Sequence, residues 1–185
     1  YYVWRTLQRR REAKKLPARH WILRCIGPWA LPWVMVSSVL FAFAFPSIVS
    51  LDGIGVLAWF ALVPLFLVLL TATPGMAVFY GVFFGTLQAL LINYWHGTYN
   101  YVTLHLITIA IVVEYLLFMF PLVWVMRRSA KWAVLFVPAA WVVFDWVRSI
   151  GVLGYPWGIV GTSQYRFLPL IQLASITGVW GIGFV

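Results

Sequence analysis

Long apolar runs alternate with short polar stretches along most of the chain. Each run approaches the roughly 20 apolar residues that a helix needs to cross the hydrocarbon core of a bilayer. The runs are continuous, unlike the alternating pattern of a transmembrane strand. The pattern therefore predicts an all-α, polytopic transmembrane helical bundle of about six spans, at residues about 27–45, 54–72, 76–95, 102–126, 132–149 and 167–185.

The composition agrees with a membrane protein. Hydrophobic residues make up 64% of the 185 residues and charged residues only 9%, whereas a soluble domain carries about 25% charged residues. The chain does not begin with Met, and it stops at Val185 inside the last apolar run. We therefore expect it to be a piece of a longer protein, truncated at the C-terminus.

The positive charge is concentrated at the N-terminus. Eight of the 13 Lys and Arg residues lie within residues 1–24, and the net charge is +9. A basic run beside an apolar segment is typical of a cytoplasmic tail that contacts anionic headgroups. We interpret residues 1–26 as such a tail and expect no nucleic-acid partner. The basic turn of Arg127, Arg128 and Lys131 then also lies inside.

The outward side of the predicted protein consists of the loops 46–53, 96–101 and 150–166. This orientation leaves only Arg148 and Arg166 outside and eleven Lys and Arg residues inside, as the positive-inside rule requires. The outward loops also hold most of the unusual polar and aromatic residues. We therefore predict a multi-pass protein with a cytoplasmic N-terminus and a functional outer face.

Three ionisable residues interrupt the predicted spans, where a charge costs several kcal/mol unless it is paired or solvated. Asp145 and Arg148 are three residues apart, so they share one face of a helix. They form either a polar anchor that shapes a headgroup or substrate site, or an intrahelical ion pair, and the two roles are compatible. Glu114 is either a proton or cation site of a transporter or a packing residue bonded to a neighbouring helix.

No metal or cofactor site is expected. His96, His105 and Glu114 are nine residues apart in succession, which lacks the i, i+4 pairing of a helical metal site. Cys25, the single cysteine, excludes an intrachain disulfide. The spacing of the remaining Ser and His residues recommends no nucleophile and base for covalent catalysis.

A loop rich in Gly, Pro and aromatic residues follows Arg148. Tyr155, Pro156 and Trp157 lie between two glycines, and Trp and Tyr prefer the headgroup level of a bilayer. A turn seated there would place Gln164 and Arg166 near lipid phosphates. The alternative is an ordinary loop of the aromatic belt.

The segment 138–184 resembles a known family. It reads PAAWVVFDWVRSIGVLGYPWGIVGTSQYRFLPLIQLASITGVWGIGF. A helix with Trp141, Asp145 and Arg148, then a G-[FY]-P-W turn, a G-x-S-Q element and a Gly-containing helix, is similar to the apolipoprotein N-acyltransferase family. Some members have Glu at the position of Asp145. The earlier FAFAFPS, LAWFALVPL and LINYWHGTY are also similar to the family's membrane region, so the likeness covers about 30–185. The later part looks most like spirochaete-type members.

The resemblance implies an enzyme of lipoprotein maturation in the bacterial cytoplasmic (inner) membrane. In the family, a nitrilase-like α/β domain on the outer face supplies a Cys nucleophile, a Glu base and a Lys oxyanion stabiliser. The Cys takes an acyl chain from a phospholipid and passes it to the α-amine of a diacylglyceryl apolipoprotein, without a cofactor. That domain follows the spans, so none of its catalytic residues is assigned here, and Cys25 is not the nucleophile.

Two other interpretations stay open. The chain is also compatible with a membrane anchor domain fused to a glycosyltransferase, or with a small transporter or channel that uses Glu114 and the pair of Asp145 and Arg148. An acyltransferase would continue past Val185 into an outward catalytic domain, whereas a transporter would continue with further spans. In either case the partners include membrane lipids, and the fragment alone is expected to be inactive as an acyltransferase.

Overall fold

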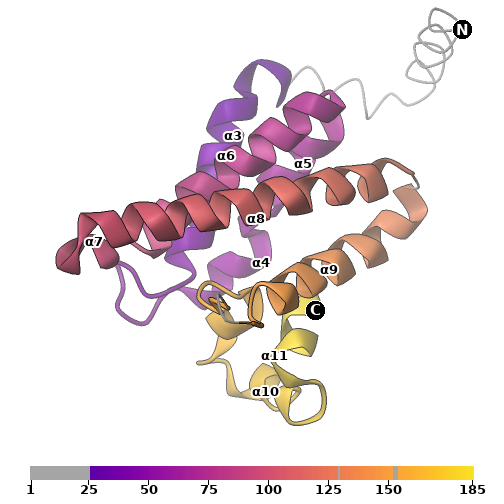
Figure 1. Ribbon diagram of the computed structural model, residues 1–185. Coiled ribbons are helices and arrows are strands. Elements are labelled where there is room, and N and C mark those ends of the chain that lie inside the picture. The colour runs from indigo at the N-terminus through magenta and orange to yellow at the C-terminus, as the bar shows by residue number, and fades with distance from the viewer. Residues whose placement is uncertain (1–25, 129, 152–153) are drawn as a thin grey trace, which may run out of the picture.

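A computed structural model describes residues 26–128, 130–151 and 154–185 (Figure 1). Every regular element within these residues is a helix, which confirms the all-α prediction. Apart from Ile26, the predicted basic tail and Cys25 lie outside the described residues. The helices are η1 (Gly27–Trp29), α3 (Ala30–Phe43), η2 (Gly55–Leu57), α4 (Ala58–Ala61), α5 (Val63–Thr71), α6 (Pro74–Ile92), α7 (His96–Tyr99), α8 (Tyr101–Arg128), α9 (Ala130–Val147), η3 (Val160–Gln164), α10 (Leu168–Ile171) and α11 (Ala174–Phe184).

Two helices of the described chain are long and apolar enough to cross a membrane. They are α6 and the stretch Tyr101–Arg127 of α8. The other apolar helical stretches have 10–17 residues: Gly27–Phe43, Gly55–Thr71, Trp132–Val147 and Ala174–Phe184. The bundle of six spans therefore stays a prediction.

Two of the predicted spans are interrupted. In the segment 54–72 the helix breaks at Leu62, and Pro64 follows in the first turn of α5, where no helical partner exists for the missing N–H. In the segment 167–185, α10 is a single turn and Gly178 inside α11 has a φ of 65°. Gly adopts positive φ at little cost, so an apolar run with a glycine can bend without any change in hydropathy.

The helices α6 and α8 approach closely because two glycines lie at their contact. A Cβ atom added at Gly81 would collide with the side chain of Met119, and one added at Gly85 would collide with the ring of Tyr115. The spacing of the two glycines matches the small-xxx-small pattern by which apolar helices pack without bulky side chains between them. Each glycine therefore makes room for one large side chain of α8.

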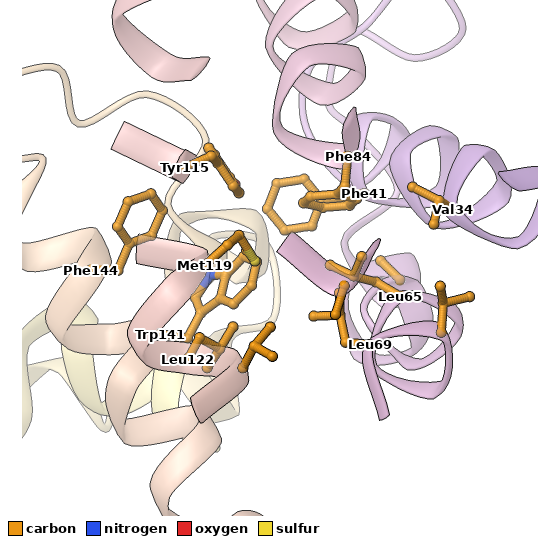
Figure 2. Packing of buried hydrophobic residues seen from close by; sticks show 14 of the residues in the cluster. Val34, Phe41, Leu65, Leu69, Phe84, Tyr115, Met119, Leu122, Trp141 and Phe144 are labelled. Atoms are coloured by element: carbon orange, nitrogen blue, oxygen red, sulfur yellow. The ribbon is translucent and has the colours of Figure 1, made fainter. Parts of the chain in front are cut away.

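Aromatic side chains fill the core between these helices. Figure 2 shows Phe41 of α3, Phe84 of α6 and Tyr115 of α8 gathered together, and the ring centroids of Phe84 and Tyr115 are 5.9 Å apart. Trp141 of α9 is 3% exposed, and its ring lies 5.6 Å from that of Phe118. The pair of Phe118 and Trp141 is edge-to-face, and such a pair contributes about 0.5–1.5 kcal/mol beyond the area that it buries. The core thus joins α3, α6, α8 and α9.

The connecting segments gather at two places. Tyr165 donates to the Asp52 carbonyl oxygen, and the Tyr155 hydroxyl lies 3.1 Å from His96 Nε2, so the segments around residues 52, 96 and 155–165 lie together. Elsewhere, Arg127 near the end of α8 donates to the carbonyl oxygens of Leu69 and Ala72 at the end of α5 (2.8 and 2.5 Å). In Figure 1, α8 crosses the molecule between these two places. The fold therefore gathers parts of all three predicted outward loops on one side.

Candidate functional site

Asp145 and Arg148 lie buried where α9 ends. They are 2% and 5% exposed, and their nearest charged atoms, Asp145 Oδ1 and Arg148 Nη1, are 3.9 Å apart. The spacing of three residues placed them on one face of the helix, as predicted from the sequence. A positive side chain also suits the C-terminal end of a helix, where the backbone carbonyls carry partial negative charge.

Each of these charged groups binds the loop that follows more closely than it binds the other. Asp145 Oδ2 accepts a hydrogen bond from the backbone N–H of Val160 (3.2 Å), and Arg148 Nη2 donates to the carbonyl oxygen of Trp157 (2.6 Å). The backbone N–H of Tyr155 in turn donates to the carbonyl oxygen of Arg148 (2.8 Å). We call this arrangement of Asp145, Arg148 and loop residues 155–160 the loop clamp.

The loop can fold back onto α9 because glycines bend it. Gly151 and Gly158 have φ of 85° and 78°, a region that other residues rarely adopt. Between them lies Pro156, which has no N–H to satisfy and fixes its own φ. The half-exposed Trp157 ring lies 5.7 Å from that of Trp95, which directly precedes α7. The Gly-Tyr-Pro-Trp-Gly sequence is thus a turn whose backbone carbonyl is aimed at Arg148.

Tyr155 connects the loop clamp to the end of α6. Its hydroxyl donates to Asn93 Oδ1 (2.6 Å) and lies 3.1 Å from His96 Nε2. Because the hydroxyl proton is used by Asn93, His96 Nε2 must be the donor in the second bond. Burial raises the pKa of Tyr155 from its ordinary value of 10 to about 12, so the hydroxyl keeps its proton at neutral pH. The ring of His96 is stacked on Trp95, with centroids 3.8 Å apart.

Gln164 connects η3 to η2, more than 100 residues earlier in the chain. Its Nε2 donates to the carbonyl oxygen of Gly55 (2.7 Å), and its Oε1 accepts from Trp59 Nε1 (3.2 Å). A Cβ atom at Gly55 would collide with the carbonyl oxygen of Ser163. Gln164 is buried and its amide is engaged by protein groups. The structure therefore places Gln164 in a packing contact and not at a surface where it would meet lipid phosphates.

Arg166 lies at the surface, opposite Asp52. Its Nη1 donates to Asp52 Oδ2 (2.6 Å), and the two side chains are 66% and 60% exposed. Tyr165 adds a bond to the carbonyl oxygen of Asp52 (3.1 Å). Exposed pairs of this kind contribute about 0–1 kcal/mol, so Arg166 remains accessible to a further anionic group.

Glu114 is half-buried on α8 and does not form a cluster with His96 and His105, the histidines that would share a metal site with it. It lines a groove between α8 and α9 that Arg148 also lines. His105 bonds to the carbonyl oxygen of Tyr101 in its own helix (2.7 Å), whereas His96 bonds to Tyr155. In the part of the chain that the structure describes, no three His, Cys, Asp or Glu side chains come together as a metal site.

The sequence did not reveal the partners of Tyr155 and Gln164. Asn93, His96 and Gly55 lie far from them along the chain, and only the fold brings them together. The cluster LINYWHGTY was a usable signal, because so many polar and aromatic groups at the end of an apolar run need partners. Both ends of the Asn93 amide at the end of that run are bonded, since Nδ2 also donates to the Ala89 carbonyl oxygen (2.9 Å).

The arrangement defines a helical domain whose polar groups hold loops in place. The hydroxyls of Ser149 and Ser163 donate to backbone carbonyls and do not contact a base. Residues 37–185 match the family model described as the apolipoprotein N-acyltransferase N-terminal domain. The chain therefore belongs to the apolipoprotein N-acyltransferase family, which confirms the resemblance seen in the sequence.

Similar proteins include several that carry the family's name. Apolipoprotein N-acyltransferase 1 of Treponema denticola is 32% identical over 151 residues, which are 82% of this chain and 28% of that protein. Apolipoprotein N-acyltransferase 2 of Treponema pallidum is 35% identical (80% and 27%). The apolipoprotein N-acyltransferase of Geobacter metallireducens is 34% identical (82% and 30%). The chain thus spans under a third of the length of these relatives, and spirochaetes are among their sources.

Proposed function

We propose that this chain is the membrane-embedded platform of an apolipoprotein N-acyltransferase. The complete enzyme would transfer an acyl chain from a phospholipid to the N-terminal diacylglyceryl-cysteine of a bacterial lipoprotein. The observation that carries the proposal is the match of residues 37–185 to the family's N-terminal domain. The catalytic groups would come from a nitrilase-like domain outside this chain.

The proposed reaction has two steps. A Cys thiolate attacks an ester carbonyl of the phospholipid, a thioester forms, and the lysophospholipid leaves with the proton that the Glu base returns to it. The free α-amine of the lipoprotein then attacks the thioester, the amide forms, and the thiol is released. A Lys would stabilise the negative oxygen in both tetrahedral states.

We place the chain in the cytoplasmic membrane, with several spans and the N-terminus inside. Two observations support this orientation. Asp52, His96 and Tyr155 come from the three loops that the charge distribution predicts to face outward, and hydrogen bonds of Tyr155 and Tyr165 join the segments in which they lie. Arg127, which the same rule places inside, is bonded away from these loops, at the end of α5. One side of the domain would thus face the periplasm and the other the cytoplasm.

The loop clamp gives this platform a specific task. A catalytic domain that acts on a lipid ester must be held at a fixed height above the bilayer, because reacting groups need near-contact geometry. Asp145 and Arg148 fix the loop 155–160 through two bonds, and Tyr155 and Gln164 fasten the same region to α6 and η2. The outward loops would therefore form a rigid surface on which the catalytic domain packs.

The test is an acyl-transfer assay on the complete protein encoded by the gene. The protein is purified in phospholipid vesicles, and transfer of a labelled acyl chain to a diacylglyceryl peptide is followed by mass spectrometry. We expect transfer in the wild type and none when the Cys of the downstream catalytic domain is replaced by Ala. Absence of both a downstream catalytic domain and transfer would refute the proposal and leave an anchor or a transporter.

A further inference from the structure

A groove runs between α8 and α9 on the outside of the helical domain. Its volume is about 470 Å³, within the range of about 300–1,000 Å³ typical of ligand sites. Apolar side chains line most of it, and two of them, Leu117 of α8 and Val143 of α9, are 71% and 57% exposed. If the domain lies in a bilayer, this side of the groove opens toward lipid.

Charged groups from both helices also line the groove. Glu114 comes from α8 and Arg148 from the end of α9. The groove therefore combines a long apolar wall with a small polar part, which matches a molecule that is apolar over most of its length and polar at one end. A segment of purely apolar protein would leave this polar part without partners, at a cost of several kcal/mol in an apolar medium.

Unpartnered buried polar atoms gather around this polar part. Arg148 is 5% exposed, and its Nε has no hydrogen-bond partner. The buried hydroxyl of Tyr115 also has no hydrogen bond, and Asp145 Oδ1 has none beside its ion pair with Arg148 Nη1 (3.9 Å). The three groups lie close together, since the ring of Phe144 is 5.0 Å from that of Tyr115 and 5.6 Å from Arg148 Cζ. Buried polar groups in folded proteins nearly always have a partner, so a ligand that accepts a hydrogen bond from Arg148 Nε would supply the partner that this donor lacks.

We propose that the groove between α8 and α9 binds one acyl chain of a glycerophospholipid, with the ester end of the lipid at Arg148. The chain would lie along Leu117 and Val143, and the ester carbonyl would accept from the guanidinium. A phospholipid is chosen because it is the bulk amphiphile against which the exposed wall of the groove would lie. The inference rests on the membrane location in the proposed function, and it does not require turnover.

Photolabelling of the complete protein tests this site. The protein is placed in vesicles of phosphatidylethanolamine and phosphatidylglycerol that contain a phospholipid with a diazirine midway along one acyl chain. After irradiation, peptides that carry the lipid are identified by mass spectrometry. We expect labels in residues 117–125 of α8 and 140–147 of α9, whether or not the preparation transfers acyl chains.

Two pairs of variants make the test specific. Val143→Trp and Leu117→Trp fill the groove, whereas Val134→Trp and Leu116→Trp add the same ring at exposed positions of the same helices outside it. Displacing a few methylene groups lowers binding by about tenfold or more. We therefore expect the first pair to lose about tenfold in labelling and the second pair to match the wild type. Because each helix has its own groove-filling variant and control, the test still works if one variant fails to fold.

Several outcomes would overturn the inference. Labelling that is equal in Val143→Trp and Val134→Trp would show that lipid does not occupy the groove. A diazirine-bearing diacylglyceryl peptide that labels the groove when the phospholipid does not would assign the site to the acceptor. Cross-links from the groove to a segment after Val185 would show that protein covers it. Loss of acyl transfer in a wild type that still labels the groove would refute the proposed function alone.

Discussion

Replacing Arg148 by Ala tests the loop clamp most directly. The change removes a bond from a charged donor to the Trp157 carbonyl oxygen (2.6 Å), and bonds of that kind contribute about 1.5–3 kcal/mol. It also leaves Asp145, 2% exposed, without its counter-charge. Breaking a buried ion pair in this way costs about 3–5 kcal/mol in total. Since folded proteins are stable by about 5–15 kcal/mol, the variant loses about a fifth of its stability or more.

The assay is thermal unfolding of the complete protein in detergent, together with its level in membranes. Arg166→Ala is the matched control, because Arg166 belongs to an ion pair that is 66% exposed on its side and whose loss costs about 0–1 kcal/mol. We expect a clearly lower midpoint and less membrane-inserted protein for Arg148→Ala, and almost no change for Arg166→Ala. Acyl transfer should fall with the amount of folded protein.

A double variant separates two effects of Arg148→Ala: the unpaired charge left on Asp145 and the lost hydrogen bond to the loop. If Asp145 is destabilising mainly because it is left unpaired, then Asp145→Leu combined with Arg148→Met should be more stable than Arg148→Ala alone, as replaced buried pairs often are. Recovery should be incomplete, because Val160 and Trp157 would still lack their partners. Equal unfolding midpoints for Arg148→Ala and Arg166→Ala would refute the loop clamp, because they would show that Asp145 and Arg148 do not stabilise the loop.

Three further predictions follow from the packing, the loop and the orientation. Gly85→Ala should destabilise the complete protein by about 1–3 kcal/mol because the added methyl group meets Tyr115, while Gly75→Ala, with open space around it, should unfold like the wild type. Tyr155→Phe removes the bond to Asn93 and should cost about 0.5–1.5 kcal/mol. Burial raises the pKa of Tyr155 in the folded protein to about 12 from an ordinary 10. The stability that the protonated hydroxyl contributes is therefore complete below pH 10 and is lost as the pH rises through 12. The unfolding midpoint of Tyr155→Phe should fall less than that of the wild type over this pH range. A Cys at Ile48, which is 80% exposed, should react with a membrane-impermeant maleimide in intact spheroplasts, and protection there until lysis would reverse the proposed orientation.

The sequence predicted the helical class because long apolar runs without alternation favour helices over transmembrane strands. It did not predict the breaks at Leu62 and Gly178, since neither changes the hydropathy of its run. The pairing of Asp145 with Arg148 followed from their spacing, because local spacing on a helix fixes direction. Which loop atoms they bind did not follow, since Trp157 and Val160 are placed by a turn whose shape depends on glycine conformations.

The contacts of Tyr155 and Gln164 also could not be predicted from the sequence. Asn93 is 62 residues from Tyr155, and Gly55 is 109 residues from Gln164. No periodic pattern joins such distant positions, and only the arrangement of α6, η2 and η3 brings them together. The charge distribution gave a coarser prediction that groups the loops by side of the membrane, and that orientation stays a prediction.

If α9 enters the membrane as proposed, the order of synthesis gives the loop clamp a consequence for its insertion. Asp145 leaves the ribosome 15 residues before Val160, whose N–H it accepts. At about 5–20 residues per second, roughly one to three seconds pass in which Asp145 and Arg148 do not yet have the loop that they bind. During that interval a charged helix end is costly in lipid, so α9 should stay beside the insertion machinery until the turn at 154–160 has emerged. Slowing translation just after Arg148 would then lengthen a stage at which quality-control proteases can act.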